Sequence, residues 1–107
     1  MQVEKYYNEQ GDVAVLYSPS YGAGWSTWTT GDEEFMMFDK TLVQYALDAV
    51  EEGAVVAYMK TKGVEAYTGG WKDIRVEFLP KGTQFIIEEY DGNESISILD
   101  KIKFNVA

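Results

Sequence analysis

Glycine-containing turns divide this chain into short segments, and this division constrains the fold more than any other feature of the sequence. The Lys-Gly pair at 81–82 and the Asp-Gly pair at 91–92 separate stretches in which apolar and polar residues alternate. Alternation with a period of two is typical of strands, and Asp-Gly is a strong signal for a two-residue hairpin turn. We therefore expect short, mostly antiparallel strands, at 12–19, 54–59, 64–67, 74–80, 84–90, 95–99 and 102–106.

One stretch, 39–53, has the spacing of a helix instead. Asp39 is a suitable N-cap, and Gly53 stands where helices commonly end in a left-handed residue. The apolar side chains between them fall on one stripe: Leu42, Val43, Ala46, Leu47 and Val50. One helix among several strands predicts an α+β fold. We expect the 107 residues to form a single small domain, a mostly antiparallel curved sheet or partial barrel with one covering helix at about 39–52.

The chain contains neither cysteine nor histidine, and this excludes several kinds of chemistry. There is no disulfide framework, no imidazole base and no zinc site built from nitrogen and sulfur ligands. The formal net charge of −9 at pH 7 disfavours direct binding to a nucleic-acid backbone. We predict no cofactor, and any catalysis would depend on carboxylates, hydroxyls, lysine or a metal held by oxygen ligands.

The sequence also bears on the compartment in which the protein acts. The polar stretch at 1–10 lacks the apolar core of a signal peptide, and no stretch approaches the roughly 20 apolar residues of a membrane span. Because cysteine is absent, the fold does not need an oxidising environment. A cytoplasmic location without membrane contact is therefore expected.

The loop SYGAGWSTW, at 20–28, is the strongest candidate for a binding site. Gly22 and Gly24 allow the backbone a close approach to a ligand, and successive N–H groups in such a turn form a concave nest for an anion. Trp25 and Trp28 offer flat surfaces for a base or a sugar. No lysine lies between Gly22 and Lys40, so the loop lacks the phosphate-binding motif of the P-loop proteins.

A second glycine–tryptophan loop, TGGWKD at 68–73, supplies another ring and a cation. If both loops lie at one end of the sheet, they would wall a pocket for a small ligand such as a nucleotide. The ligand-binding residues predicted on this basis are Tyr21, Gly22, Gly24, Trp25, Ser26, Thr27, Trp28, Trp71 and Lys72. The alternative is that each tryptophan fills part of the core and the glycines only turn the chain.

Acidic residues gather at two places along the sequence. The first group is Asp32, Glu33 and Glu34 with Asp39, and the second is Glu88, Glu89, Asp91 and Glu94. The run at 91–94 lacks the ligand spacing of an EF-hand, so no metal site is predicted there. The acids are open to three other interpretations: solvated turns, phosphate mimics on an inhibitor of DNA-binding proteins, or a hydrolase that uses Glu89 and Asp91.

Several short motifs resemble those of a family of small bacteriophage and prophage proteins. They are GAGW at 22–25, FD at 38–39, GG at 69–70 and EYDG at 89–92, and together they span most of the chain. The resemblance implies a phage accessory protein that acts in the cytoplasm of a host cell. It implies no reaction, because no activity is established for the family.

The first functional expectation is therefore non-enzymatic binding of a small ligand at the glycine–tryptophan loops. The first alternative is an acidic protein that binds a host DNA-binding or defence protein as a DNA mimic. The second alternative is a hydrolase that depends on carboxylates. A homo-oligomer is also an open expectation, because an edge strand at 64–67 or 102–106 would be able to pair across a two-fold axis.

Overall fold

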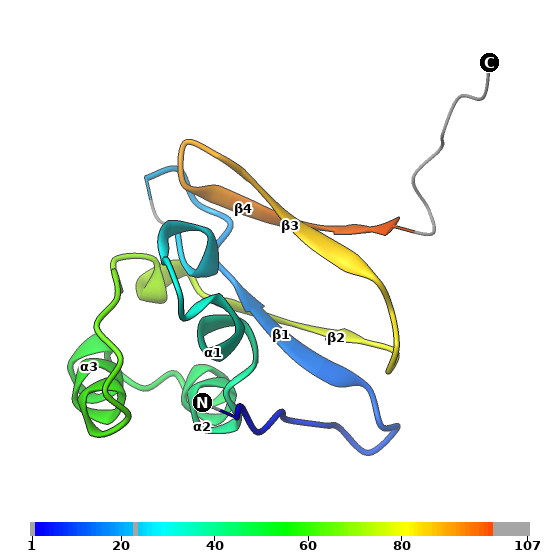
Figure 1. Ribbon diagram of the computed structural model, residues 1–107, viewed down its shortest axis with the longest axis horizontal. Coiled ribbons are helices and arrows are strands. Elements are labelled where there is room, and N and C mark those ends of the chain that lie inside the picture. The colour runs from blue at the N-terminus through cyan, green and yellow to red at the C-terminus, as the bar shows by residue number, and fades with distance from the viewer. Residues whose placement is uncertain (1, 23, 100–107) are drawn as a thin grey trace.

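In the computed structural model, which describes residues 2–22 and 24–99, two antiparallel β-ribbons lie beside three helices (Figure 1). The strands are β1 (Val13–Tyr17), β2 (Arg75–Leu79), β3 (Phe85–Tyr90) and β4 (Asn93–Ile98). The helices are α1 (Glu33–Phe38), α2 (Lys40–Leu47) and α3 (Glu52–Thr61), with 3-10 turns η1 (Ser26–Trp28) and η2 (Trp71–Asp73). The predicted α+β class and the antiparallel pairing are confirmed for the described part of the chain.

The strands form two separate ribbons, joined at one end. In the first, β1 runs antiparallel to β2, with Val13 opposite Leu79. In the second, β3 and β4 form the hairpin predicted from the Asp-Gly pair, and Asp91 and Gly92 have φ angles of 52° and 85°. These positive angles are the geometry that makes Asp-Gly a hairpin signal. A bridge between Pro19 and Asn93 connects the ribbons, and over residues 2–22 and 24–99 they do not close into a barrel.

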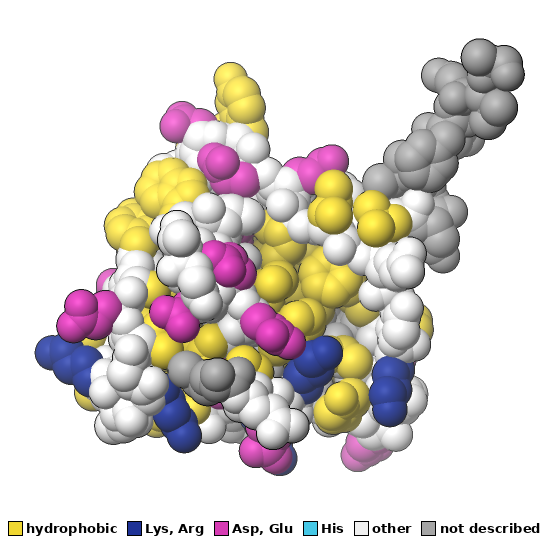
Figure 2. All heavy atoms as spheres, viewed as in Figure 1, with side chains coloured by type: hydrophobic (Ala, Val, Ile, Leu, Met, Phe, Trp, Pro, Cys, Tyr) yellow, Lys and Arg dark blue, Asp and Glu magenta, His cyan; other side chains and the backbone are white. Residues whose placement is uncertain are grey.

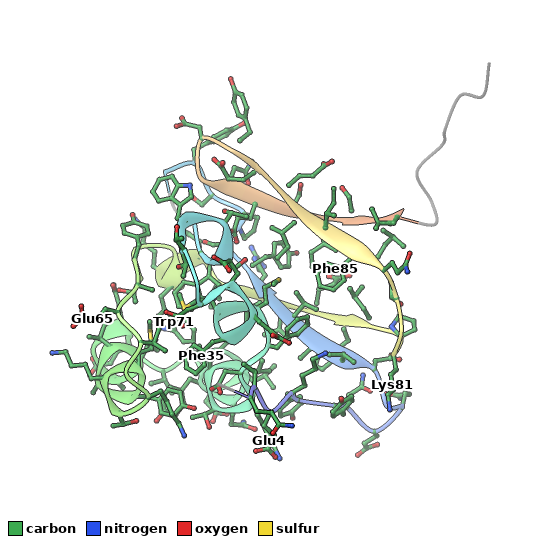
Figure 3. The ribbon with its side chains drawn as sticks, viewed as in Figure 1. Glu4, Phe35, Glu65, Trp71, Lys81 and Phe85 are labelled. Atoms are coloured by element: carbon green, nitrogen blue, oxygen red, sulfur yellow. The ribbon has the colours of Figure 1, made fainter. Side chains whose placement is uncertain are left out.

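The core lies where the helices cover the β1–β2 ribbon. The three central residues of β1, 14–16, are fully buried, so both faces of this strand are covered. Helix α1 packs against β1, and α2 packs against both β1 and β2. Figure 3 shows Phe35 of α1 and Trp71 of η2 in the interior between α1 and α3. On β2, Val76 and Phe78 pack against this core.

The helix predicted at 39–53 is interrupted before its expected end. Its start is confirmed, because the Asp39 side chain caps α2 by accepting a hydrogen bond from the N–H of Leu42 (3.1 Å). Its end at Gly53 is wrong: α2 stops at Leu47, and Ala49 takes a left-handed φ of 54°. The carbonyl of Tyr45 then accepts from the N–H of Val50 (3.0 Å), which closes the helix end.

The strands predicted at 54–59 and 64–67 are also wrong. The first lies within α3, where Val55 and Met59 are one turn apart and both buried. Two adjacent valines favour a strand locally, but burial at a spacing of four residues stabilises a helix. Gly63, with a left-handed φ of 70°, follows the end of α3 at Thr61. Helix α1 was not expected, and the strand predicted at 102–106 lies outside the described residues.

The cap of α2 also ties the helices together. Asp39 is 8% exposed, and its Oδ2 accepts a hydrogen bond from the hydroxyl of Tyr58 on α3 (2.8 Å). Burial, together with the neighbouring Asp39 carboxylate, raises the pKa of Tyr58 to about 12. Asp39 is therefore a structural cap, and it does not contribute to an acidic surface.

Candidate functional site

The glycine–tryptophan loop, residues 20–28, lies across the turn of the β3–β4 hairpin. The N–H of Gly22 donates to the carbonyl of Asp91 (2.5 Å), and the N–H of Gly24 donates to the carbonyl of Gly92 (2.8 Å). Figure 1 shows the loop beside the closed end of the hairpin. The backbone of the loop is thus hydrogen-bonded to a turn that lies about 70 residues further along the sequence.

A buried carboxylate holds the second half of the loop. The Glu94 side chain is 0% exposed, and its Oε1 accepts from the N–H of Ser18 (3.0 Å). Its Oε2 accepts from the N–H groups of Trp25 (2.9 Å) and Thr27 (3.0 Å) and from the hydroxyl of Thr27. Among the described residues, the single ion pair joins Lys40 to Glu4, so these donors alone balance the charge of Glu94.

The N–H groups of Trp25 and Thr27 thus point at the chain's own carboxylate, whereas those of Gly22 and Gly24 donate to carbonyls of the hairpin turn. A phosphate at this position would have to displace Glu94 from donors that are already satisfied, and the two negative charges would repel each other. The backbone amides of Trp25 and Thr27 are consequently engaged within the fold.

Trp25 and Trp71 belong to the core. Trp25 is 0% exposed and Trp71 is 5% exposed, and their ring centroids lie 5.6 Å apart. The indole N–H of Trp25 donates to the carbonyl of Met36, and that of Trp71 donates to the carbonyl of Val50 (2.7 Å). Ser18 links the two loops further, because its hydroxyl donates to the carbonyl of Gly70 (2.7 Å). For these two tryptophans the structure agrees with the core-filling alternative.

The glycines of both loops allow aromatic rings to lie directly on the backbone. A Cβ atom at Gly24, whose φ is 38°, would overlap the Trp28 ring, and one at Gly69 would overlap the Tyr67 ring. The two rings lie 5.0 Å apart, centroid to centroid. The glycines thus serve close packing and, at Gly24, a left-handed backbone.

Four rings are left facing outward around this loop, and we call them the aromatic rim: Tyr21, Trp28, Tyr67 and Tyr90. They are 68%, 41%, 44% and 76% exposed, respectively. Tyr21 meets Tyr90 edge to face at 6.3 Å, and the Tyr67 hydroxyl donates to the carbonyl of Gly22 (3.2 Å). Figure 2 shows hydrophobic side chains projecting from this end of the molecule. Clustered exposed aromatics are typical of interaction surfaces.

The predicted ligand-binding residues are thus divided among three environments. Tyr21 and Trp28 are on the rim, whereas Gly24, Trp25 and Ser26 are buried and Thr27 is bonded to Glu94. The exposed residue Lys72 and one edge of Trp71 line a separate hollow of about 350 Å³. This hollow lies between the end of α2 and the start of α3, beside Glu51 and Glu52. Binding of a small ligand by these residues stays a prediction.

The acidic residues in the described part of the chain support turns or lie apart from one another. Within residues 2–22 and 24–99, no three carboxylates lie close enough together to hold a metal ion. Glu33 accepts from the N–H of Gly31 (2.6 Å), and Glu89 accepts from the N–H of Gly92 (2.6 Å), so both support turns. Figure 2 shows acidic side chains spread over the visible face rather than in one strip.

Comparisons with known proteins give no further guide to the site. No protein-family model, no curated protein and no solved structure matches the chain. Over the described residues, none of the helices has the length and apolar character needed to cross a membrane.

Sequence reasoning missed three residues that define this site. Tyr67 and Tyr90 were not placed beside the loop, because nothing local indicates which distant segments meet. Glu94 belongs to the second acidic group of the sequence, but its position in the strand offers a further signal. It shares a face of the hairpin with the apolar Ile96 and Ile98, since side chains alternate along a strand. An inward-facing carboxylate was therefore predictable from the register.

Proposed function

We propose that the protein is a binding protein that docks onto another protein through the aromatic rim. The proposal rests on the exposure of four aromatic rings, which three separate segments contribute. They surround a loop whose backbone N–H groups are hydrogen-bonded to the buried Glu94. Aromatic side chains bury a large area at low entropic cost, and they dominate the energetics of protein interfaces. A rigid loop also reduces the ordering cost of binding.

The charge around the rim favours a partner of a different kind over a second copy of the chain. Segments 20–39 and 82–99, which carry three of the four rim rings, contain no lysine or arginine, while Glu88, Glu89 and Asp91 lie next to Tyr90 in the sequence. Two copies that met through this surface would bring like charges together, in a protein whose net charge is already −9. The resemblance to phage proteins would make the partner a host protein, and this remains a prediction.

The proposal is tested by capture from bacterial lysate with matched variants. The rim variant carries Tyr21→Ala and Tyr90→Ala, and the control carries Tyr7→Ala, because Tyr7 is 48% exposed but outside the rim. All three residues are exposed, so these variants keep the core intact. We expect the wild type and the control to retain the same partner, identified by mass spectrometry, and the rim variant to lose it.

Two results would contradict the proposal. One is that the rim variant captures the partner as well as the control does. The other is that native mass spectrometry of gently purified protein releases a bound small molecule and no protein partner is captured. The second result would return the function to small-ligand binding, with the hollow beside Trp71 and Lys72 as the first place to examine.

A further inference from the structure

The outer face of the β3–β4 hairpin carries an open hollow of about 510 Å³ next to the aromatic rim. Its lining residues are Glu88, Glu89, Tyr90, Asn93 and Ser95, and we call it the outer hollow. Glu88 pairs with Ser95 and Tyr90 pairs with Asn93 in the ladder, so these four residues share one face of the hairpin. The hollow therefore combines a carboxylate, an aromatic ring and small polar groups on one face of the hairpin.

Within residues 82–99, the sequence offers no cation to balance this charge. No lysine or arginine occurs in segment 82–99, and the single ion pair among the described residues lies elsewhere, between Lys40 and Glu4. The carboxylate of Glu89 is used by the turn, where it accepts from the N–H of Gly92. Glu88 is exposed and stands on the same face as Tyr90, two residues along the strand. The Glu88 carboxylate is thus accessible to a cation of a binding partner.

The ring of Tyr90 adds a second requirement on that cation. Tyr90 is 76% exposed, and Tyr21 meets it edge to face, so the ring is supported from one side and open to solvent on another. The Cα atoms of two residues that are two positions apart on a strand lie about 7 Å from each other, so the carboxylate of Glu88 and the ring of Tyr90 are neighbours on one face. A guanidinium group spans these two partners, because it stacks on a ring and donates a fork of hydrogen bonds to a carboxylate. An ammonium group cannot stack in this way.

We propose that the outer hollow binds an arginine side chain of the protein partner. The inference rests on the proposed function, since it assumes that the partner is a protein. It adds a chemical preference that the rim alone does not imply: arginine over lysine at the partner's contact point.

The test uses two short glycine–serine peptides that are identical except that one carries arginines where the other carries lysines. Binding to the full-length protein is followed by NMR at physiological salt. We expect the arginine peptide to bind about two- to fivefold more tightly, with shift changes centred on the outer hollow. Tyr90→Ala should remove the preference, and Glu88→Gln should weaken both peptides. The matched control Glu77→Gln, an exposed acid on β2, should change neither.

Equal binding of the two peptides, or shift changes away from the outer hollow, would overturn the inference. So would an arginine preference that survives Tyr90→Ala. These outcomes are separable from the failure of the proposed function, because the lysate capture depends on the whole rim. If the rim variant loses its partner while the peptides show no preference, docking through the rim stands and the arginine contact is rejected.

Discussion

Glu94 is a single side chain that takes the place of a bound anion. Its two oxygens accept four hydrogen bonds from Ser18, Trp25 and Thr27, and the side chain is fully buried. The N–H groups of Trp25 and Thr27 point inward at this carboxylate, while the rings of Tyr21 and Trp28 lie on the outside. These contacts fix the second half of the loop to the hairpin.

The substitution Glu94→Gln tests this role. Glutamine keeps the size of the side chain but replaces one acceptor oxygen with an NH₂ group that faces donors. We expect the free energy of unfolding to fall by about 1–3 kcal/mol, because buried N–H groups lose their acceptor. Urea denaturation measures this change in the free energy of unfolding.

The matched control is Glu88→Gln, on the exposed face of the same hairpin. It should change the unfolding free energy by less than about 0.5 kcal/mol. Equal effects of the two substitutions would show that the Glu94 carboxylate does not hold the loop.

At the scale of elements, the structure departs from the helix predicted at 39–53 at the junction between α2 and α3. The sequence predicts the apolar stripe beginning at Leu42 and the cap at Asp39, because both depend on neighbours within one or two helical turns. The break at Ala49 was not, since alanine ordinarily favours helix and glycine is the usual left-handed residue. The burial of Val55 and Met59 against the core then decides that α3 is a helix.

Ala49→Gly is expected to stabilise the protein. An L-residue in the left-handed region costs about 1–2 kcal/mol, and glycine avoids this cost while adding chain entropy to the unfolded state. The net gain should be about 0.5–1 kcal/mol, measured as an upward shift of the urea midpoint. Ala57→Gly, on the exposed side of α3, should instead destabilise by about 1 kcal/mol. A loss of stability in both variants would contradict the left-handed end of α2.

At the scale of the whole molecule, the fold class and the hairpin were predictable, and the site was predictable only in part. The Asp-Gly turn and the alternating strands are local signals, so β2, β3 and β4 were expected near their observed positions. The meeting of the loop, the hairpin and the segment at Tyr67 is set by long-range contacts such as that between Glu94 and Trp25. A single sequence carries no direct record of such contacts.

The central claim is that the glycine–tryptophan loops turn two tryptophans inward and leave one on the surface. The most direct measurement is hydrogen exchange of the three indole N–H groups in a ¹⁵N-labelled sample, with Trp28→Phe used to assign one signal. Trp25 and Trp71 should exchange slowly, because they are buried and donate to carbonyls, while Trp28, 41% exposed, should exchange fast. Fast exchange at Trp25 or Trp71 would contradict the burial of these rings and would favour an open pocket lined by them.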